Sequence, residues 1–431
     1  MKKLVVLFII ILLAVNIIMA SEKVKISREI ITGGTAEDSV RWIENTTDGG
    51  YVITGFTSSW KEFPEHNGNN DYFVIKFTEN GKEEWRKVYG GRGDDRGFAV
   101  RQTSDGGYVV AGASISSNGR SEIHGLWDGW VIKLDKDGNL LWESSFGGRD
   151  NETIRDIIQT KDGGYIFCGY TFSKELDNYH GGKDFWIVKL DKNGKEEWQK
   201  VYGGSGYDMP YSVIQTTDNG YALTGYTFSK DGELTGKTNH GQGDYWILKL
   251  SSSGSIQWSQ VYGGSAWDEP RVIKQIPWDR GYIIAGVSGS VDGDVKSNKG
   301  RWDAWIVNLD ANGKLRWEKS FGGSNLDKAF SLTITKDKRY VFAGFTMSDD
   351  GDVKGKKEEM DGWVVKISRN GKLYWEECFS IGKGQSIESI VQLDNNQLVF
   401  VGGEFTNDRL EVAGDAGRRY KDIWIVDFWS K

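Results

Sequence analysis

The sequence has 431 residues, with 38% hydrophobic and 27% charged side chains, 57 glycines, 19 tryptophans and only four prolines. Many glycines and aromatic residues without helix-length apolar patterns favour an all-β chain over a helical one. The formal net charge is −7, and lysines and arginines are spread without a basic cluster. This distribution argues against nucleic acid as a partner.

The chain begins with a segment typical of an export signal. Its first three residues include two lysines, residues 4–20 are apolar apart from Asn16, and a cleavage site of acceptable type ends at Ala20. We therefore expect residues 1–20 to be a signal peptide, with an uncleaved membrane anchor as the alternative. The expected location is secreted or extracytoplasmic, in a periplasm or at a cell surface.

The rest of the chain repeats one pattern of strands and turns seven times. The aspartate that opens the first turn recurs at Asp48, Asp105, Asp162, Asp218, Asp279, Asp337 and Asp394, at spacings of 57, 57, 56, 61, 58 and 57 residues. A four-stranded propeller blade needs about 40–50 residues before loop insertions. We therefore predict that residues 21–431 form a single all-β domain, a seven-bladed β-propeller of antiparallel blades.

Each unit holds four predicted strands, named A to D in chain order. Strand A is an alternating run such as 212–215, and a tight Asp-Gly-Gly-Tyr turn such as 105–108 follows it. Strand B is a glycine-containing run such as 109–112, and strand C opens with Asp and an aromatic residue, as at 184–188. An Asn-Gly or Asp-Gly step, such as 193–194, predicts a two-residue type I′ turn into strand D.

The two ends of the repeat region complement each other. Residues 24–32 occupy a strand D position with no strand C before them, and residues 422–428 form a strand C with no strand D after them. We expect the N-terminal strand to complete the seventh blade, because this closure removes two exposed sheet edges.

Residues that recur in every unit are interpreted as architecture. Twelve tryptophans on strands C and D are expected to pack between blades, and the aspartate that opens strand C is expected to accept loop N–H groups. Cys168 and Cys378 lie in different blades and are expected to be buried free thiols. A further carboxylate follows the Gly-Gly pair at Asp38, Asp95, Glu152, Asp208, Asp268 and Asp327. These six are candidates for an acid/base pair, and turn capping is the favoured interpretation.

The stretch LDKNGKEEW at 190–198 resembles the tryptophan-docking repeat of quinoprotein (PQQ-type) dehydrogenases and of the related outer-membrane assembly propeller. Here the spacing from Asp to Trp is one residue shorter, and the unit occurs seven times rather than the usual eight. The whole unit more closely resembles secreted bacterial and archaeal propeller repeat proteins with the pattern DGGYxxxGxT, HGGxDxWxxKLDxNGxxxW and YGG. That resemblance covers nearly all of residues 24–431 and implies the fold and export rather than a particular chemistry.

The chain direction places the A→B and C→D turns on one face of the ring and the long B→C and D→A loops on the other. Variable loops on a rigid scaffold are the usual place of recognition. The candidate ligand-binding residues are the histidines and non-repeating aromatics of these loops: Trp60, His66, His124, Trp127, Tyr179, His180, Tyr207, His240, Trp267 and Trp302.

The histidines are expected to shape their own loops, because equivalent positions in successive blades do not converge on one ion. No metal and no cofactor are predicted, with calcium at the Asp-Gly steps 231–233, 292–294 and 349–352 as the alternative to ordinary turns.

Three functional hypotheses follow. The first is a non-catalytic extracytoplasmic binding or scaffold protein, expected to be a monomer, with a glycan or a cell-surface or secreted protein as its partner. The second is a polysaccharide hydrolase or lyase with paired carboxylates about 5–10 Å apart in a deep cleft. The third is a quinoprotein-like redox enzyme, which the blade count and the shortened motif disfavour.

Overall fold

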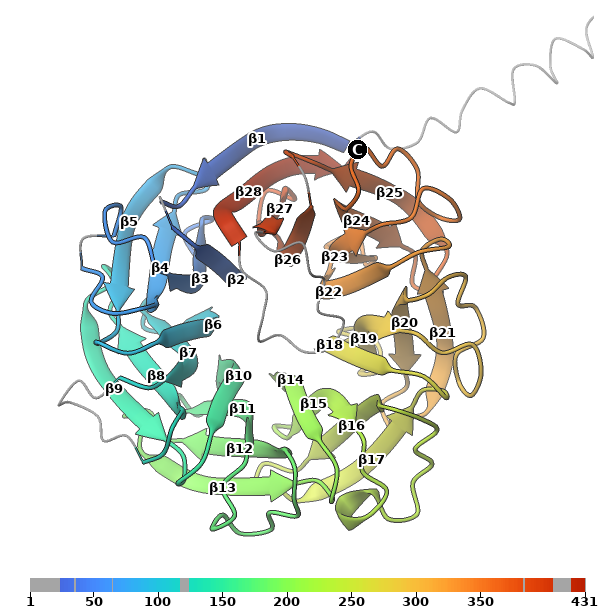
Figure 1. Ribbon diagram of the computed structural model, residues 1–431, viewed down its shortest axis with the longest axis horizontal. Helices are drawn as coiled ribbons and strands as arrows, with labels where there is room; N and C mark the ends of the chain where they lie inside the picture. The colour runs from blue at the N-terminus through green and yellow to red at the C-terminus, as the bar shows by residue number, and fades with distance from the viewer. Residues whose placement is uncertain are drawn as a thin grey trace, which may run out of the picture.

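The computed structural model describes residues 24–430 except 35, 64, 117–123, 383 and 406–419. It is a ring of seven four-stranded antiparallel sheets, as predicted, with one strand of each sheet around a central axis and one on the outer wall (Figure 1). The predicted signal segment lies outside the described residues. Within the part of the chain that the structure describes, no helix has the length and apolar character needed to cross a membrane.

Strands A to D follow one another outward from the axis. The innermost strands are β2 (Asp38–Asn45), β6 (Asp95–Gln102), β10 (Glu152–Gln159), β14 (Asp208–Gln215), β18 (Asp268–Gln275), β22 (Asp327–Ile334) and β26 (Gln385–Gln392). Strands B are β3 (Tyr51–Thr57), β7 (Tyr108–Ser114), β11 (Tyr165–Thr171), β15 (Tyr221–Thr227), β19 (Tyr282–Ser288), β23 (Tyr340–Thr346) and β27 (Leu398–Phe405).

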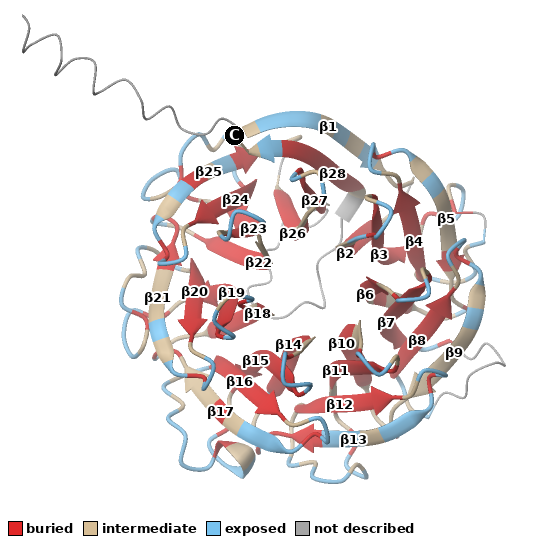
Figure 2. Cartoon of the chain, turned by 180° about the vertical axis from the view of Figure 1, so that it is seen from behind, coloured by how far each residue is buried: buried red, intermediate tan, exposed pale blue. Residues whose placement is uncertain are grey.

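Strands C are β4 (Asp71–Phe77), β8 (Asp128–Leu134), β12 (Asp184–Leu190), β16 (Asp244–Leu250), β20 (Asp303–Leu309), β24 (Asp361–Ile367) and β28 (Tyr420–Ser430). The outermost strands are β5 (Glu83–Tyr89), β9 (Leu140–Phe146), β13 (Glu196–Tyr202), β17 (Ile256–Tyr262), β21 (Leu315–Phe321), β25 (Leu373–Phe379) and β1 (Val24–Thr32). One 3₁₀ turn, η1 (Gly232–Leu234), lies in a B→C loop. Figure 2 shows that strands B and C are buried, whereas the outer strands consist mostly of intermediate and exposed residues.

Two local predictions were wrong. Strand A begins four residues earlier than the alternating run at 212–215, because a β-bulge at Tyr211 interrupts the alternation. The C→D connection is not a two-residue type I′ turn, which needs positive φ at both central residues. In the C→D connection of the third blade, only Gly194 of residues 191–195 has positive φ, Asp191 N donates to Lys195 O at 2.8 Å, and the register shifts at Leu190. This is the longer hairpin in which a left-handed glycine forms a bulge.

The predicted closure of the ring is confirmed. Strand β1 pairs antiparallel with β28, from Val24 opposite Ser430 to Thr32 opposite Ile423, and so completes the seventh blade. Arg28 Nη1 lies 3.2 Å from Asp427 Oδ2, and Trp424 Nε1 donates to Glu29 Oε1 at 2.9 Å. Side-chain contacts therefore add to the backbone pairing that holds the two ends together.

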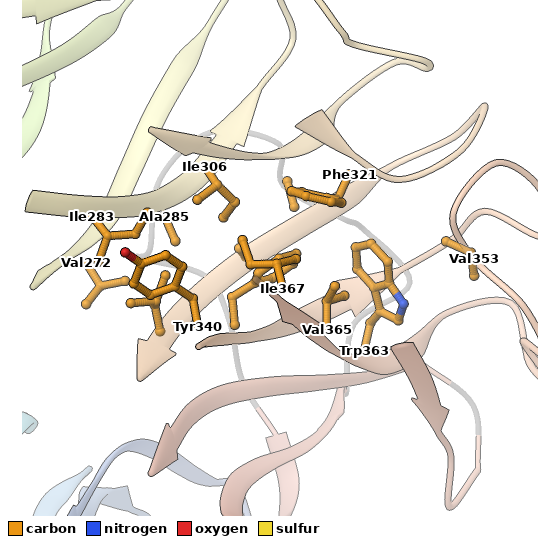
Figure 3. Packing of buried hydrophobic residues seen from close by; sticks show 14 of the residues in the cluster. Val272, Ile283, Ala285, Ile306, Phe321, Tyr340, Val353, Trp363, Val365 and Ile367 are labelled. Carbon is orange, nitrogen blue, oxygen red and sulfur yellow. The ribbon is translucent and has the colours of Figure 1, made fainter. Parts of the chain in front are cut away.

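The hydrophobic core is divided among the seven junctions between consecutive blades, with one cluster at each. Figure 3 shows the junction between the fifth and sixth blades, where Ile306 and Phe321 face Tyr340, Trp363 and Ile367. The recurring aromatics make these junctions, as predicted: strand D tryptophans meet the first tyrosine of the next blade, with ring centroids 5.6 Å apart for Trp85 and Tyr108 and 5.7 Å apart for Trp142 and Tyr165. The two cysteines are free and buried, also as predicted.

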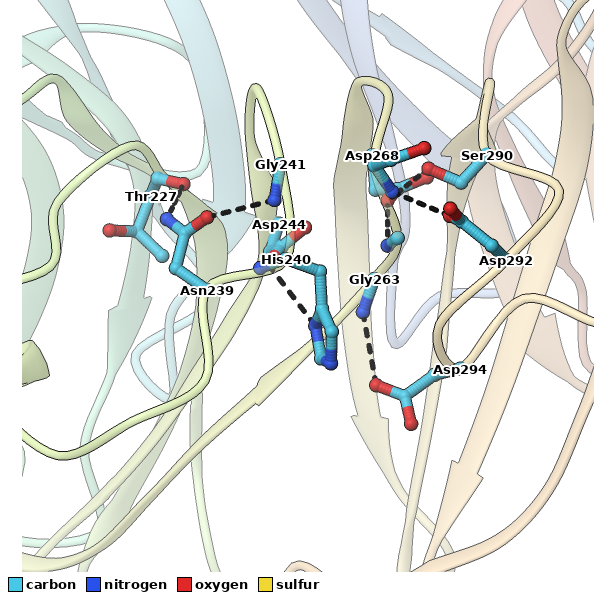
Figure 4. A network of polar contacts seen from close by, with 12 residues as sticks. Thr227, Asn239, His240, Gly241, Asp244, Gly263, Asp268, Ser290, Asp292 and Asp294 are labelled. Carbon is cyan, nitrogen blue, oxygen red and sulfur yellow. Dashed lines mark hydrogen bonds and ion pairs between the residues drawn. The ribbon is translucent and has the colours of Figure 1, made fainter.

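Carboxylates join the same blades at the B→C and D→A face. At the junction of the fourth and fifth blades, Asp268 N donates to Gly243 O at 2.7 Å, and its carboxylate accepts from Gly264 N at 2.7 Å and Ser290 Oγ at 2.9 Å (Figure 4). Asp244 of the preceding blade accepts from His240 N at 2.6 Å. The same backbone bond from strand A to the preceding blade recurs at Asp95, Glu152, Asp208, Asp327 and Gln385.

The two carboxylates at this junction leave no space for a side chain on Gly263. A Cβ there would lie 2.2 Å from Asp244 Oδ1 and 2.7 Å from Asp268 Oδ2. Burial, and then the neighbouring carboxylate, raises the pKa of Asp303 to about 7 at the next junction, and burial raises that of Asp268 to about 6. These two carboxyl groups therefore keep their protons to a higher pH in the folded ring than in the unfolded chain.

A second set of carboxylates, in the A→B turns, has the opposite pKa shift at Asp48, Asp105, Asp162, Asp218 and Asp337. Asp218 is 2.9 Å from the buried Lys249 Nζ, and Asp105 is 3.0 Å from Lys133 Nζ. Burial by itself would raise the pKa of Asp218, but hydrogen bonds from Thr216 and Lys249 outweigh it and lower the value to about 2.

We predict that the ring is most stable at about pH 4. The raised pKa values of Asp303 and Asp268 contribute stability at low pH that is lost progressively as the pH rises from their ordinary value of 3.8 to the folded values of about 7 and 6, whereas the lowered pKa of Asp218 contributes stability that is lost as the pH falls from 3.8 to about 2. Urea midpoints at pH 5 should exceed those at pH 8, by about 1.4 kcal/mol per pH unit for each proton involved. Asp303→Asn should flatten this dependence, and the exposed Asp349→Asn should leave it unchanged. Equal flattening by both variants would contradict the assignment.

We predict that Arg28→Ala weakens the closure in a pH-dependent way. Burial raises the pKa of Asp427 to about 6 although Arg28 lowers it, so at pH 8 the variant leaves a buried, ionised carboxylate without this partner. The free energy of unfolding should fall by about 2 to 3 kcal/mol at pH 8 and much less at pH 5, where Asp427 is protonated. Urea denaturation followed by tryptophan fluorescence measures this, with the exposed Lys25→Ala on the same strand as the control. An equal loss at both pH values would show that Arg28 acts through packing alone.

Candidate functional site

The recurring carboxylates that were candidates for an acid/base pair are inside the junctions. Asp95 is fully buried and accepts hydrogen bonds from Gly91 N at 2.8 Å and Ser116 Oγ at 2.7 Å. Glu152 is equally buried and accepts from Gly148 N at 2.7 Å and Thr171 Oγ1 at 2.6 Å. These contacts agree with turn capping.

Three of the four histidines are held in their own loops through the backbone, and the His180 imidazole also lies 3.8 Å from Glu233 Oε2 in the loop of the next blade. His124, His180 and His240 each donate a backbone N–H to the aspartate that opens the following strand C, at 2.6 to 2.7 Å. Lysines 299 and 357 do the same in the fifth and sixth blades, so the position requires a backbone N–H rather than an imidazole. His66 is buried, with Nε2 4.0 Å from Asp71 Oδ2. Among the described residues, no three His, Cys, Asp or Glu side chains are grouped as metal ligands.

The aspartates of the Asp-Gly steps bind the neighbouring D→A loop. Asp231, Asp292 and Asp350 each accept a backbone N–H at 2.7 Å, from Ser205, Ser265 and Ser324 respectively. These carboxylates therefore fix the B→C loops against the ring, as Figure 4 shows for Asp292.

The candidate aromatics are distributed around the face. Trp60 is 63% exposed and its ring lies 5.5 Å from Lys61 Nζ. Trp267 packs on Tyr226 and Phe228, at centroid distances of 5.3 and 4.9 Å. The remaining rings are Tyr179, which donates to Gly182 O at 2.9 Å; Tyr207, which is 52% exposed; and Trp302, whose ring lies 4.6 Å from Lys328 Nζ. Trp127 lines a pocket together with residues of the first three blades.

A ring of side chains that the sequence analysis missed surrounds the axis. Each innermost strand carries a β-bulge at its fourth residue. The seven bulge residues are Arg41, Phe98, Arg155, Tyr211, Arg271, Phe330 and Glu388, and all of them line one small axial cavity of about 70 Å³. Three arginines therefore alternate with three aromatic rings, and one glutamate completes the ring.

Cation–π contacts and ion pairs connect these side chains. The Arg155 guanidinium lies 4.9 Å from the centre of the Phe98 ring and 5.7 Å from that of Tyr211, and the Arg271 guanidinium lies 4.4 Å from Tyr211. Arg41 is 3.7 Å from Glu388 Oε2, and Arg271 is 3.0 Å from Glu269 Oε1.

A larger pocket of about 430 Å³ opens beside this ring on the B→C and D→A face. It is formed by the first three blades and is lined by Arg41, Phe56, Arg96, Phe98, Ala113, Trp127, Asn151, Thr153, Arg155, Tyr170, Phe172 and Lys183. Arg41, Phe98 and Arg155 belong to both cavities, so the pocket adjoins the axial cavity. Five aromatic rings and four cations line it, and none of its lining residues is acidic.

The pocket has space at the second blade because the side chain of Ala113 is small. The equivalent strand B residue is aromatic in four other blades, as Phe56, Tyr170, Tyr226 and Phe345. Ala113 pairs with Arg96 in the same register and is buried, and the missing ring leaves space between Phe56 and Tyr170.

A sequence signal for this site was available. The bulge residue always follows the recurring acid by three positions, so alignment of the seven units places Arg41, Phe98 and Arg155 in one column. Their chemical variety at a fixed position of the repeat distinguishes them from the architectural residues. A strand that alternates regularly, without a bulge, would point these side chains in a different direction. The sequence pattern alone therefore did not place them at the axis.

No family model matches the chain. The regulatory protein FlaEY of Caulobacter vibrioides is 29% identical over 101 residues, which are 22% of this chain and 11% of that protein, so the chain spans only a small part of this curated relative.

Among solved structures, the WD40 β-propeller domain of Doa1 aligns with a TM-score of 0.54, 11% identity, and coverage of 95% of this chain and 98% of that chain. A protein of unknown function from Dyadobacter fermentans aligns with a TM-score of 0.48, 10% identity, and coverage of 95% and 99%. A luciferin-regenerating enzyme aligns with a TM-score of 0.39, 9% identity, and coverage of 93% and 95%. At these identities the Doa1 likeness shows the β-propeller fold and no particular activity.

Proposed function

We propose that the protein is an extracytoplasmic, non-catalytic binding protein whose ligand is a glycan. The observation that carries the proposal is the pocket of about 430 Å³ at the mouth of the axial cavity, with its five aromatic rings. This volume lies within the roughly 300–1,000 Å³ range of small-molecule sites. Strands A and B hold eight of the twelve lining residues, and loops of the B→C and D→A face hold the other four.

The chemistry of the lining suits a sugar. The apolar face of a pyranose ring packs against an aromatic ring, and Trp127, Tyr170 and Phe172 offer such rings. Asn151 and Thr153 offer an amide and a hydroxyl for the sugar hydroxyls. The N-terminal segment, whose charge and apolar run are typical of an export signal, supports an extracytoplasmic location, where polysaccharides and glycosylated surfaces are the available glycans.

The pocket offers no acid/base pair for the alternative of a hydrolase or lyase. Such an enzyme needs two carboxyl groups on either side of the scissile bond, and no lining residue of the pocket is Asp or Glu. Binding without cleavage is therefore the function that this geometry favours.

We predict that Trp127→Ala weakens glycan binding by about tenfold, because the variant removes a stacking surface. The measurement is retention of the mature protein on immobilised cellulose, xylan, chitin, polygalacturonate, alginate and starch, with soluble products assayed in parallel. Trp429→Ala is the matched control, because Trp429 is partly exposed and lies at the end of β28 on the opposite face. Cleavage of any member of the panel would overturn the non-catalytic assignment, and no retention on any member would overturn glycan binding.

A further inference from the structure

We propose that the pocket binds the terminal sugar unit of a glycan chain, and that Ala113 sets this preference by leaving room for one ring in the second blade. This inference rests on the proposed function and assigns the part of the glycan that the protein recognises. The observation behind it is the packing around one strand B position, compared across the blades.

The position of Ala113 holds an aromatic ring in four other blades, and each of these rings packs on the bulge residue of its own blade. The distances from the ring centre to the guanidinium carbon or ring centre of the bulge residue are 5.3 Å for Phe56 and Arg41, 5.8 Å for Tyr170 and Arg155, 6.1 Å for Tyr226 and Tyr211, and 5.7 Å for Phe345 and Phe330. In the second blade the bulge residue Phe98 lines the pocket beside Ala113. The place that a fifth ring would take is therefore part of the pocket.

A ring at this position is enclosed by protein on almost every side. Phe56, Tyr226 and Phe345 are each at most 6% exposed. A sugar ring that takes the same place in the second blade has one free direction, toward the B→C and D→A face. An internal unit of a glycan carries linkages on two sides of its ring, whereas a terminal unit carries only one. The enclosure therefore selects the end of a chain.

The surroundings of this place suit a sugar better than an apolar ring. Phe98 offers its ring to the apolar face of a pyranose, and Asn151 and Thr153 of the adjoining blade offer an amide and a hydroxyl. The residue equivalent to Asn151 two junctions further on is Trp267, which packs on Tyr226 with ring centroids 5.3 Å apart. Asn151 is therefore where a side chain contacts the ring at this position, and it presents hydrogen-bonding groups there.

The first experiment relates binding to the number of chain ends. Each of the six polysaccharides of the panel is compared, in immobilised form, with its own partial hydrolysate, and the mature protein bound per gram of glycan is measured. We expect the binding capacity of the retaining glycan to rise in proportion to the number of chain ends. An unchanged capacity per gram would overturn the terminal assignment and leave the proposed function standing, whereas no retention in any form would overturn both.

The second experiment varies the space at the second blade. Ala113→Val and Ala113→Tyr introduce residues that other blades carry at this position, as Val287 and Tyr170, so both are compatible with the strand. Calorimetric titration with the retained hydrolysate should show an affinity about tenfold lower for Ala113→Val and no binding for Ala113→Tyr, with urea midpoints close to that of the parent protein. Val287→Ala, at the same position of the fifth blade, is the matched control and should bind normally. Unchanged affinity in a folded Ala113→Tyr, or in Ala113→Val if the first variant does not fold, would overturn the site.

The third experiment tests the polar side of the place. Asn151→Ala should lower the affinity for the same hydrolysate by about tenfold, because a hydrogen bond to a sugar hydroxyl is lost. Tyr207→Ala changes the equivalent position at the next junction, outside the pocket, and should leave the affinity unchanged. Equal losses in both variants would overturn the role of Asn151. Binding of N-acetyltyrosine amide but of no glycan would place an aromatic side chain of a protein partner here and overturn the proposed function.

Discussion

The ring depends on the buried carboxylates at the blade junctions. The first residue of an inner strand, such as Asp268, donates its backbone N–H to the preceding blade and accepts hydrogen bonds from the Gly-Gly turn and from a serine of its own sheet. A single side chain thereby fixes the turn, the register of strand A and the approach of two blades. The first glycine of the turn follows from the same constraint, because two carboxylates occupy the space where its Cβ would lie.

This constraint explains how much of the structure the sequence predicted. Seven copies of one unit and two complementary ends determine a closed ring, since propeller strands follow one another outward without crossing. The recurring tryptophans and aspartates are at junctions and turns, as expected of residues that every blade needs. The turn into strand D was predicted wrongly because Asn-Gly suits two hairpin geometries, and the register around Leu190 distinguishes them.

The candidate site was predicted less well. The long loops indicated the face on which the pocket opens, and Trp127 lines the pocket, but three of the four cations and three of the five rings come from strands. Arg155 lies in a β-bulge, and Ala113 matters through the ring that it lacks. Neither effect is visible in a motif, because each depends on comparing one position across blades whose three-dimensional register is known. The bulge residue of each inner strand turns its side chain toward the axis, whereas the neighbouring residues of the same strand pack between blades.

The pairing of the first and last strands also sets how the molecule stands relative to anything joined to its N-terminal end. Val24 lies opposite Ser430, at the end of strand C, where the A→B and C→D turns are. Val24, the first residue that the structure describes, therefore lies on the side of the ring away from the pocket. If the protein were fixed to a lipid bilayer or a cell wall through this end, the pocket would face away from the surface that carries it.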